Sequence, residues 1–139
     1  VQIAKQARNL GIKAQIVGAD GWDGATSVAG NDASAIEGVI FINQYSPDME
    51  SVQDIMKKYK EKFGTDINSF GINAYDSTML LLQTIEKVGS LKASDIVKGI
   101  ASTDYKGILG SISFDSNGDP IKEPVFVQIK NGQYTTYKK

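Results

Sequence analysis

The sequence of 139 residues contains neither cysteine nor histidine. Zinc sites, thiol nucleophiles, serine–histidine–aspartate triads and imidazole acid–base catalysis each need one of these residue types. Their absence therefore removes most of the enzyme classes that a chain of this length could otherwise suggest. A sequence without cysteine is also compatible with an oxidising exterior, where free thiols are a liability.

Arginine is nearly absent as well, because Arg8 is the only arginine among 15 basic residues, which 16 acidic residues balance to a formal net charge of −1. With no basic field and one guanidinium group, we expect no binding to nucleic acid, phosphate-rich ligands or an anionic lipid surface. No apolar run approaches the roughly 20 residues that span a bilayer. The sequence does have 41% hydrophobic residues, enough for the core of an ordinary α/β fold.

The first thirty residues have the pattern of the second half of a β-α-β repeat. Apolar residues recur at helical spacing over residues 2–10, with Gly11 as the C-cap, and the apolar run Ile12–Val17 then predicts a short buried strand. The sequence thus opens in the middle of a repeat. We therefore expect it to be a portion of a longer protein.

Three helices and a second strand are predicted further along. The apolar run 36–43 indicates a strand parallel to the first. Helical spacing predicts a helix over 46–64 that begins at Ser46 as its N-cap, a largely buried helix over 72–88, and a shorter helix from Ser94.

The last third of the chain changes to a period of two. Alternating segments at 111–114, 125–129 and 133–137 predict antiparallel strands, and Asn117-Gly118 and Asn131-Gly132 predict hairpin turns with positive φ angles. The predicted fold class is α/β, with a parallel sheet flanked by helices and a C-terminal antiparallel hairpin.

The turn Asp115–Asp119 carries alternating oxygen-bearing side chains, which suggests a calcium loop. Such a loop needs glycine at its sixth position and a bidentate glutamate at its twelfth, whereas Gly118 is fourth and Phe126 is twelfth here. The hairpin interpretation is preferred, and no metal or cofactor is expected.

The candidate binding site is the segment Gly18–Asp23, which follows the first predicted strand before a helix begins. Ligands of open α/β sheets bind just past the carboxyl ends of strands. Gly21 allows the backbone to approach a ligand, Asp20 offers a negative charge, and Trp22 offers a flat apolar wall. The expected ligand is a small molecule with an ammonium group. Two structural alternatives stay open: Asp20 could cap the following turn, and Trp22 could cover the end of the sheet.

These residues also carry a family resemblance. The strings Gln6–Lys13, Gly18–Trp22 and Glu37–Val39, together with Tyr45–Asp48, Gly71–Leu82 and Gly107–Gly118, occur in collinear order. In this order they resemble the later half of a branched-chain amino acid ABC transporter substrate-binding protein, of the type 1 periplasmic-binding-protein fold. The resemblance covers essentially the whole chain.

The resemblance implies two α/β lobes joined by three crossing strands, with a ligand held between them. Residues 1–43 would belong to the second lobe, residues 44–123 to the first lobe, and residues 124–139 to the second lobe again. The crossings would lie near Asn43–Tyr45 and Lys122–Val125.

In that family, an acidic residue flanked by glycine binds the α-ammonium group of the amino acid, and Asp20 occupies the matching position. Trp22 and Gly21 would lie beside it, and Tyr45, next to a crossing, could line the cleft or pack at the hinge. The implied function is capture of an amino acid, branched-chain or otherwise aliphatic, for delivery to a membrane permease. The implied location is the periplasm or, through a lipid anchor, the outer face of the cell membrane.

Two other classes stay open. A receptor module of the same fold would use Asp20 to sense an amino acid. A metal-dependent α/β enzyme would use Asp20 and Asp23, three positions apart, to share a divalent ion. A partial chain could also pair with a second copy of itself.

Overall fold

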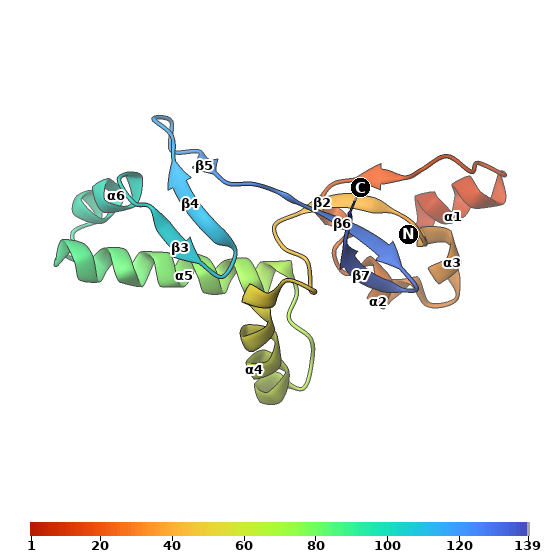
Figure 1. Cartoon of the computed structure of the whole chain (residues 1–139), viewed down its shortest axis with the longest axis horizontal. Coiled ribbons are helices and arrows are strands. Elements are labelled where there is room, and N and C mark those ends of the chain that lie inside the picture. The colour runs from red at the N-terminus through yellow and green to blue at the C-terminus, as the bar shows by residue number, and fades with distance from the viewer. Residues whose placement is uncertain (139) are drawn as a thin grey trace. The chain divides into compact units, whose positions relative to one another are not determined.

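The computed structural model of the protein describes residues 1–138. It divides into two compact units, one made of Val1–Ser69 with the segment from Pro124 onward, and one of Phe70–Glu123. Figure 1 labels most of their helices and strands. The lobe boundaries expected at 43/44 and 123/124 concern a longer protein, and they stay a prediction.

The elements of the first unit are α1 (Gln2–Asn9), β1 (Val17–Gly18), the 3-10 helix η1 (Asp20–Trp22), α2 (Ala25–Ala29), the 3-10 helix η2 (Gly30–Asp32), α3 (Ala33–Ile36), β2 (Ile40–Asn43), the 3-10 helix η3 (Glu50–Val52), α4 (Gln53–Phe63), β6 (Val125–Lys130) and β7 (Gln133–Thr136). Its four strands form one mixed sheet in the order β1-β2-β6-β7. β1 and β2 are parallel, whereas β6 runs antiparallel to β2 and forms a hairpin with β7. The parallel pair and the C-terminal hairpin predicted from the sequence are therefore confirmed.

The core of the first unit lies between this sheet and its short helices. Phe41, Val127 and Ile129 of the central strands are fully buried, and Ala4 of α1 and Ile36 of α3 pack in the same cluster. The sequence supplies this core because the inward positions of the central strands β2 and β6 are large and apolar, while α1 and α2 contribute small alanines at the contact and α3 contributes Ile36.

The first strand is much shorter than predicted, because only Val17 and Gly18 pair with β2. Residues 12–15 are exposed and do not form a strand. The Arg8 guanidinium donates hydrogen bonds to the carbonyl oxygens of Ile12 at 2.7 Å and Ala14 at 3.0 Å. A side chain thus satisfies the backbone acceptors that a neighbouring strand would otherwise satisfy. The prediction of a buried strand over 12–17 was wrong for most of its length.

The helix predicted over 46–64 begins later than expected. The backbone turns at Ser46, whose carbonyl accepts the N–H of Met49 at 3.0 Å, and regular helix starts only at η3 and α4. Ser46 is not an N-cap. Its hydroxyl is fully buried.

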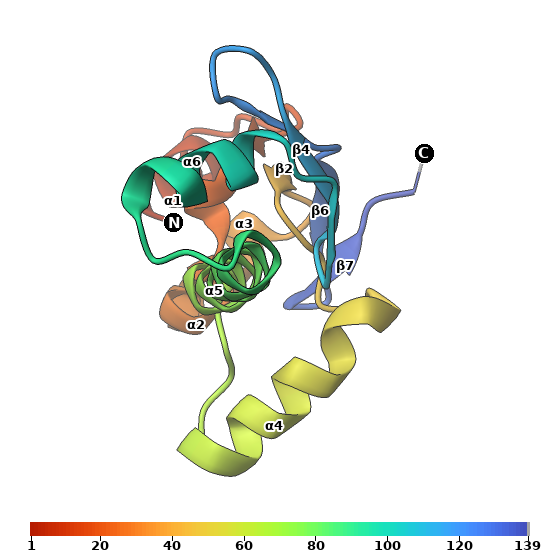
Figure 2. The same cartoon turned by 90° about the vertical axis from the view of Figure 1, so that its left-hand side faces the viewer.

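The second unit contains most of α5 (Ser69–Val88), α6 (Ala93–Ala101) and the antiparallel sheet β3 (Tyr105–Gly107), β4 (Gly110–Phe114) and β5 (Pro120–Ile121), in that order. Figure 2 looks along α5, with α6 beside it. Helix α5 is present as predicted, but the apolar stripe expected to be buried includes exposed Leu81 and Leu82. Its buried positions within this unit are Ile72, Asp76 and Thr84.

Both predicted hairpin turns are present. Asn131 and Gly132 have φ angles of 52° and 71°, as the predicted tight turn requires, whereas at the earlier turn only Gly118 has a positive φ, of 87°. Among residues 1–138, none of the helices is both long enough and apolar enough to cross a membrane.

Candidate functional site

The candidate site lies at the edge of the first unit's sheet where its two parallel strands end. β1 ends at Gly18 and β2 ends at Asn43, so the chain leaves both strands on the same side. From there it continues into η1 and into the segment that contains Tyr45. This edge is where open α/β sheets bind their ligands.

Asp20 is the first residue of η1, and its side chain is exposed. Within the described residues, no hydrogen bond or ion pair involves its carboxylate. The N-cap positions of η1 and α2 are Ala19 and Gly24, and neither helix has a side-chain cap. The alternative role for Asp20, capping of the following turn, is therefore not formed, and its charge faces solvent.

Trp22 turns its indole back over β1. A Cβ atom added at Gly18 would collide with the indole nitrogen, so glycine at this position lets the ring lie directly on the strand. The ring is half-buried and packs against the core cluster. Trp22 thus covers the end of the sheet, which was the structural alternative, and it still presents part of its surface.

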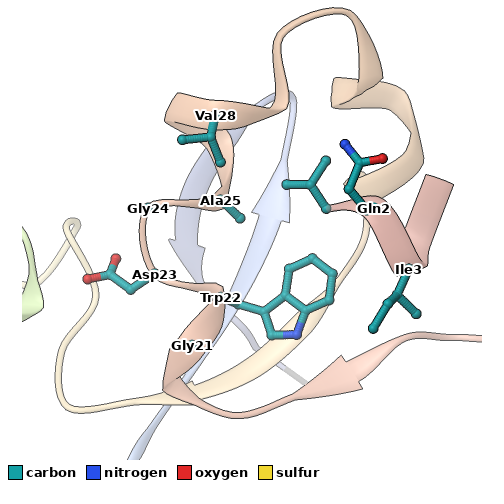
Figure 3. Close-up of a pocket in the computed structure, with 9 residues that line it drawn as sticks. Gln2, Ile3, Gly21, Trp22, Asp23, Gly24, Ala25 and Val28 are labelled. Carbon is teal, nitrogen blue, oxygen red and sulfur yellow. The ribbon is translucent and has the colours of Figure 1, made fainter.

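That surface lines a cavity of about 720 Å³. The remaining lining residues come from the start of α1, from the segment that leads into α2 and from α2 itself, and they are Val1, Gln2, Ile3, Gly21, Asp23, Gly24, Ala25 and Val28. In Figure 3 the Trp22 ring and the Ile3 side chain approach each other across it. The lining is mostly apolar, which suits an aliphatic group.

Asp23 points to the side opposite Trp22 (Figure 3). One of its carboxylate oxygens accepts a hydrogen bond from the backbone N–H of Ser69 at 2.8 Å. A shared ion between Asp20 and Asp23 would require both carboxylates to face one point, whereas Asp23 is committed elsewhere. The described residues also contain no group of three or more metal-ligating side chains.

Tyr45 is buried and lines a different cavity, of about 380 Å³, together with Asp23, Asp66 and Tyr134. Burial raises the pKa of the Tyr45 hydroxyl above its ordinary value, and the negative charge of Asp23 adds to this effect. The phenol is therefore neutral at physiological pH and keeps its proton for donation.

The four predicted site residues consequently divide among three places. Gly21 and Trp22 line the larger cavity, Tyr45 lines the smaller one, and Asp20 lies on the exposed loop between β1 and α2. Sequence reasoning missed Tyr134, whose hydroxyl contacts this loop from β7. No local pattern could reveal it, because the contact joins positions that are 112 residues apart.

The fold and the edge site define a protein class. Residues 1–133 match the family described as periplasmic binding protein, and the chain belongs to that family. This family consists of binding proteins rather than enzymes.

Three known proteins of this class are similar to the chain. The chain is 27% identical to Leu/Ile/Val-binding protein homolog 2 of Brucella abortus, over 99% of this chain and 38% of that protein. A leucine binding protein of Thermotoga maritima is 32% identical, with a TM-score of 0.82 over 98% of this chain and 40% of that one. The branched-chain amino acid transporter substrate binding protein of Streptococcus pneumoniae, solved in complex with isoleucine, is 27% identical, with a TM-score of 0.80 over 99% and 41%. The chain therefore spans about two fifths of the length of these relatives.

Proposed function

We propose that these residues form part of an ABC transporter substrate-binding protein that captures an amino acid with an aliphatic side chain. The observation that carries this proposal is the exposed carboxylate of Asp20 at the carboxyl edge of the parallel strands. It lacks a partner among the described residues, so it is free to bind a cation. The similarity to proteins named for leucine, isoleucine and valine supports the choice of ligand.

The proposed role of Asp20 is to accept a hydrogen bond from the α-ammonium group. A charge-assisted hydrogen bond of this kind is stronger than a neutral one, and it strengthens further when a closing cleft removes water. An uncharged ligand would leave Asp20 desolvated and unpaired, which costs several kcal/mol. This difference in binding free energy would favour zwitterionic amino acids over uncharged ligands.

The apolar cavity beside Trp22 suits the ligand's side chain. Ile3 and Val28 line this cavity with the indole, and neither carries a charge. Gly21 lets the backbone approach, while Tyr45 lies next to the expected crossing between lobes. We assign residues 1–43 and 124–139 to the second lobe and residues 44–123 to the first.

The proposed partner is the permease of the transporter. Membership of the periplasmic binding protein family indicates a location outside the cytoplasmic membrane. We propose that the protein is either free in the periplasm or held at the outer face of the membrane by a lipid.

A calorimetric screen of the twenty amino acids against the full-length protein that contains these residues tests the proposal. Leucine, isoleucine or valine should bind most tightly. The Asp20→Ala variant should bind at least about 30-fold more weakly, because an unpaired ammonium group in a closed site costs about 2 kcal/mol or more.

Asp104→Ala is the matched control, since Asp104 is also exposed and the substitution removes the same charge. Affinity that is unchanged in Asp20→Ala would refute the ammonium site. Binding of a sugar or an inorganic ion in place of amino acids would refute the proposed function.

A further inference from the structure

The hydroxyl group of Tyr134 connects two short helices of the candidate site. It donates a hydrogen bond to the carbonyl oxygen of Trp22 at 3.0 Å and accepts one from the backbone N–H of Thr26 at 3.1 Å. Trp22 ends η1, and Thr26 lies in the first turn of α2. One side chain therefore holds both ends of the segment Trp22–Thr26, which follows Asp20 and connects η1 to α2.

This contact replaces a missing helix cap. The first N–H groups of a helix have no partner within the helix, and an N-cap side chain ordinarily accepts one of them. The N-cap of α2 is Gly24, which has a φ angle of 84° and no side chain to offer. The Tyr134 hydroxyl supplies the acceptor from a strand that is 108 positions away in sequence.

The Tyr134 ring is itself held firmly. It packs edge-on against Phe41, with ring centroids 5.6 Å apart and an interplanar angle of 77°. Phe41 is fully buried in β2, and Tyr134 pairs with Ile129 in the β6–β7 hairpin. The hydroxyl is thus a fixed point, and the connection from Trp22 to Thr26 takes its position from it.

We propose that Tyr134 is a positioning residue that holds the Asp20 loop ready for the ligand. This inference rests on the proposed function of Asp20. A loop that is already ordered loses less conformational entropy on binding, because its carboxylate is already in the position in which it binds the ammonium group. Tyr134 acts through the backbone of this loop and does not contact the ligand.

The variant Tyr134→Phe in the full-length protein removes the hydroxyl and keeps the ring against Phe41. With L-isoleucine as the probe, calorimetry should show roughly tenfold weaker affinity, the amount expected for one or two lost hydrogen bonds. Tyr137→Phe is the matched control, because it makes the same change on the same segment and no described residue hydrogen-bonds to the Tyr137 hydroxyl. Its affinity should be unchanged.

A double-mutant cycle separates positioning from general destabilisation. If Tyr134 acts through Asp20, the substitution Tyr134→Phe should cost little further affinity in an Asp20→Asn background. An equal loss in both backgrounds would overturn the positioning role, and so would an unchanged affinity in Tyr134→Phe alone.

Two further measurements need no ligand. Amide hydrogen exchange at Thr26 should accelerate in Tyr134→Phe while exchange at Ile129 in the hairpin stays slow. The emission of Trp22, the only tryptophan, should shift at the same time. Unchanged exchange at Thr26 would overturn the inference. If the unsubstituted protein binds no amino acid, the proposed function fails; if it binds and Tyr134→Phe binds equally well, only the positioning role fails.

Discussion

At the scale of single residues, Asp20 and Asp23 differ in what their carboxylates can do. Asp23 accepts the N–H of Ser69, so its charge is already used to hold the backbone. Asp20 has no such partner among the described residues and remains exposed. The two residues have the same chemistry, and only the direction in which each points makes one structural and the other available to a ligand.

Gly18 determines where the only tryptophan lies. A Cβ atom at Gly18 would collide with the Trp22 indole, so Gly18→Ala should push the ring off β1 and into solvent. We expect a red-shifted tryptophan emission and a lower melting temperature. Gly21→Ala is the control, because its added Cβ meets nothing within 4 Å. Equal spectra for Gly18→Ala and the unsubstituted protein would contradict this prediction.

Asp76 organises the second unit. Its buried carboxylate accepts hydrogen bonds from the Tyr105 hydroxyl at 2.8 Å and from the backbone N–H groups of Ile108 and Leu109, each at 3.1 Å. Asp76→Ala should lower the free energy of unfolding by about 3 kcal/mol, because it leaves several buried donors unpaired. Tyr105→Phe, which removes one bond, should cost about 1 kcal/mol. Urea denaturation measures the free energy of unfolding of both variants. Equal losses in the two would contradict the role of Asp76 as the shared acceptor of these hydrogen bonds.

At the scale of elements, Asp48 ties the segment after β2 to β7. Its carboxylate accepts hydrogen bonds from the N–H of Thr136 at 2.9 Å and from its hydroxyl at 2.5 Å. Partial burial raises the pKa of Asp48, but hydrogen bonds from the Ser46 hydroxyl and from the hydroxyl and N–H of Thr136 lower it more, so the net pKa lies below its ordinary value.

A lowered pKa in the folded state has a definite consequence for stability against pH. The contribution of Asp48 is fully present above its ordinary pKa of 3.8 and is lost as the pH falls below that through the folded-state pKa. Asp48→Asn should therefore melt at a lower temperature than the unsubstituted protein at about pH 7, and the difference should shrink at about pH 2. If the difference in melting temperature between Asp48→Asn and the unsubstituted protein is the same at both pH values, the charge of Asp48 does not stabilise its contact with Thr136.

Helices and strands could be predicted where the sequence has a long run of regular apolar spacing or a residue pair that favours a tight turn. The hairpin at Asn131-Gly132 and helix α5 follow from local chemistry, because their residues favour those conformations in any context. The strand at 12–17 failed because Arg8, one helix earlier, satisfies the carbonyl groups of that segment. A short apolar run cannot reveal a competing side-chain donor.

At the scale of the whole molecule, many large apolar side chains are exposed. Ile3, Leu10, Phe70 and Leu91 are each at least 80% exposed, and they lie on different helices and loops of the two units. Ile3 and Val28 are exposed and also line the same mostly apolar cavity beside Trp22, and contiguous apolar surface of this kind usually marks a contact with something else. We predict that the 139-residue chain by itself associates with further copies at micromolar concentration. Light scattering at several concentrations measures this, and a single monomeric mass throughout would contradict it.

The sequence by itself determined the class of fold, the absence of cysteine and histidine chemistry, and the glycine-flanked acidic motif at the end of the first strand. These properties are local, since they depend on residue type and short spacing. Only the tertiary structure decided which carboxylate is free, that Trp22 lies on Gly18, and that Tyr134 caps α2. The contacts of Asp23 with Ser69 and of Tyr134 with Thr26 join positions 46 and 108 residues apart, and a one-dimensional pattern carries no information about such contacts. Gly18 and Trp22 are close in sequence, but their spacing does not fix the direction in which the indole turns.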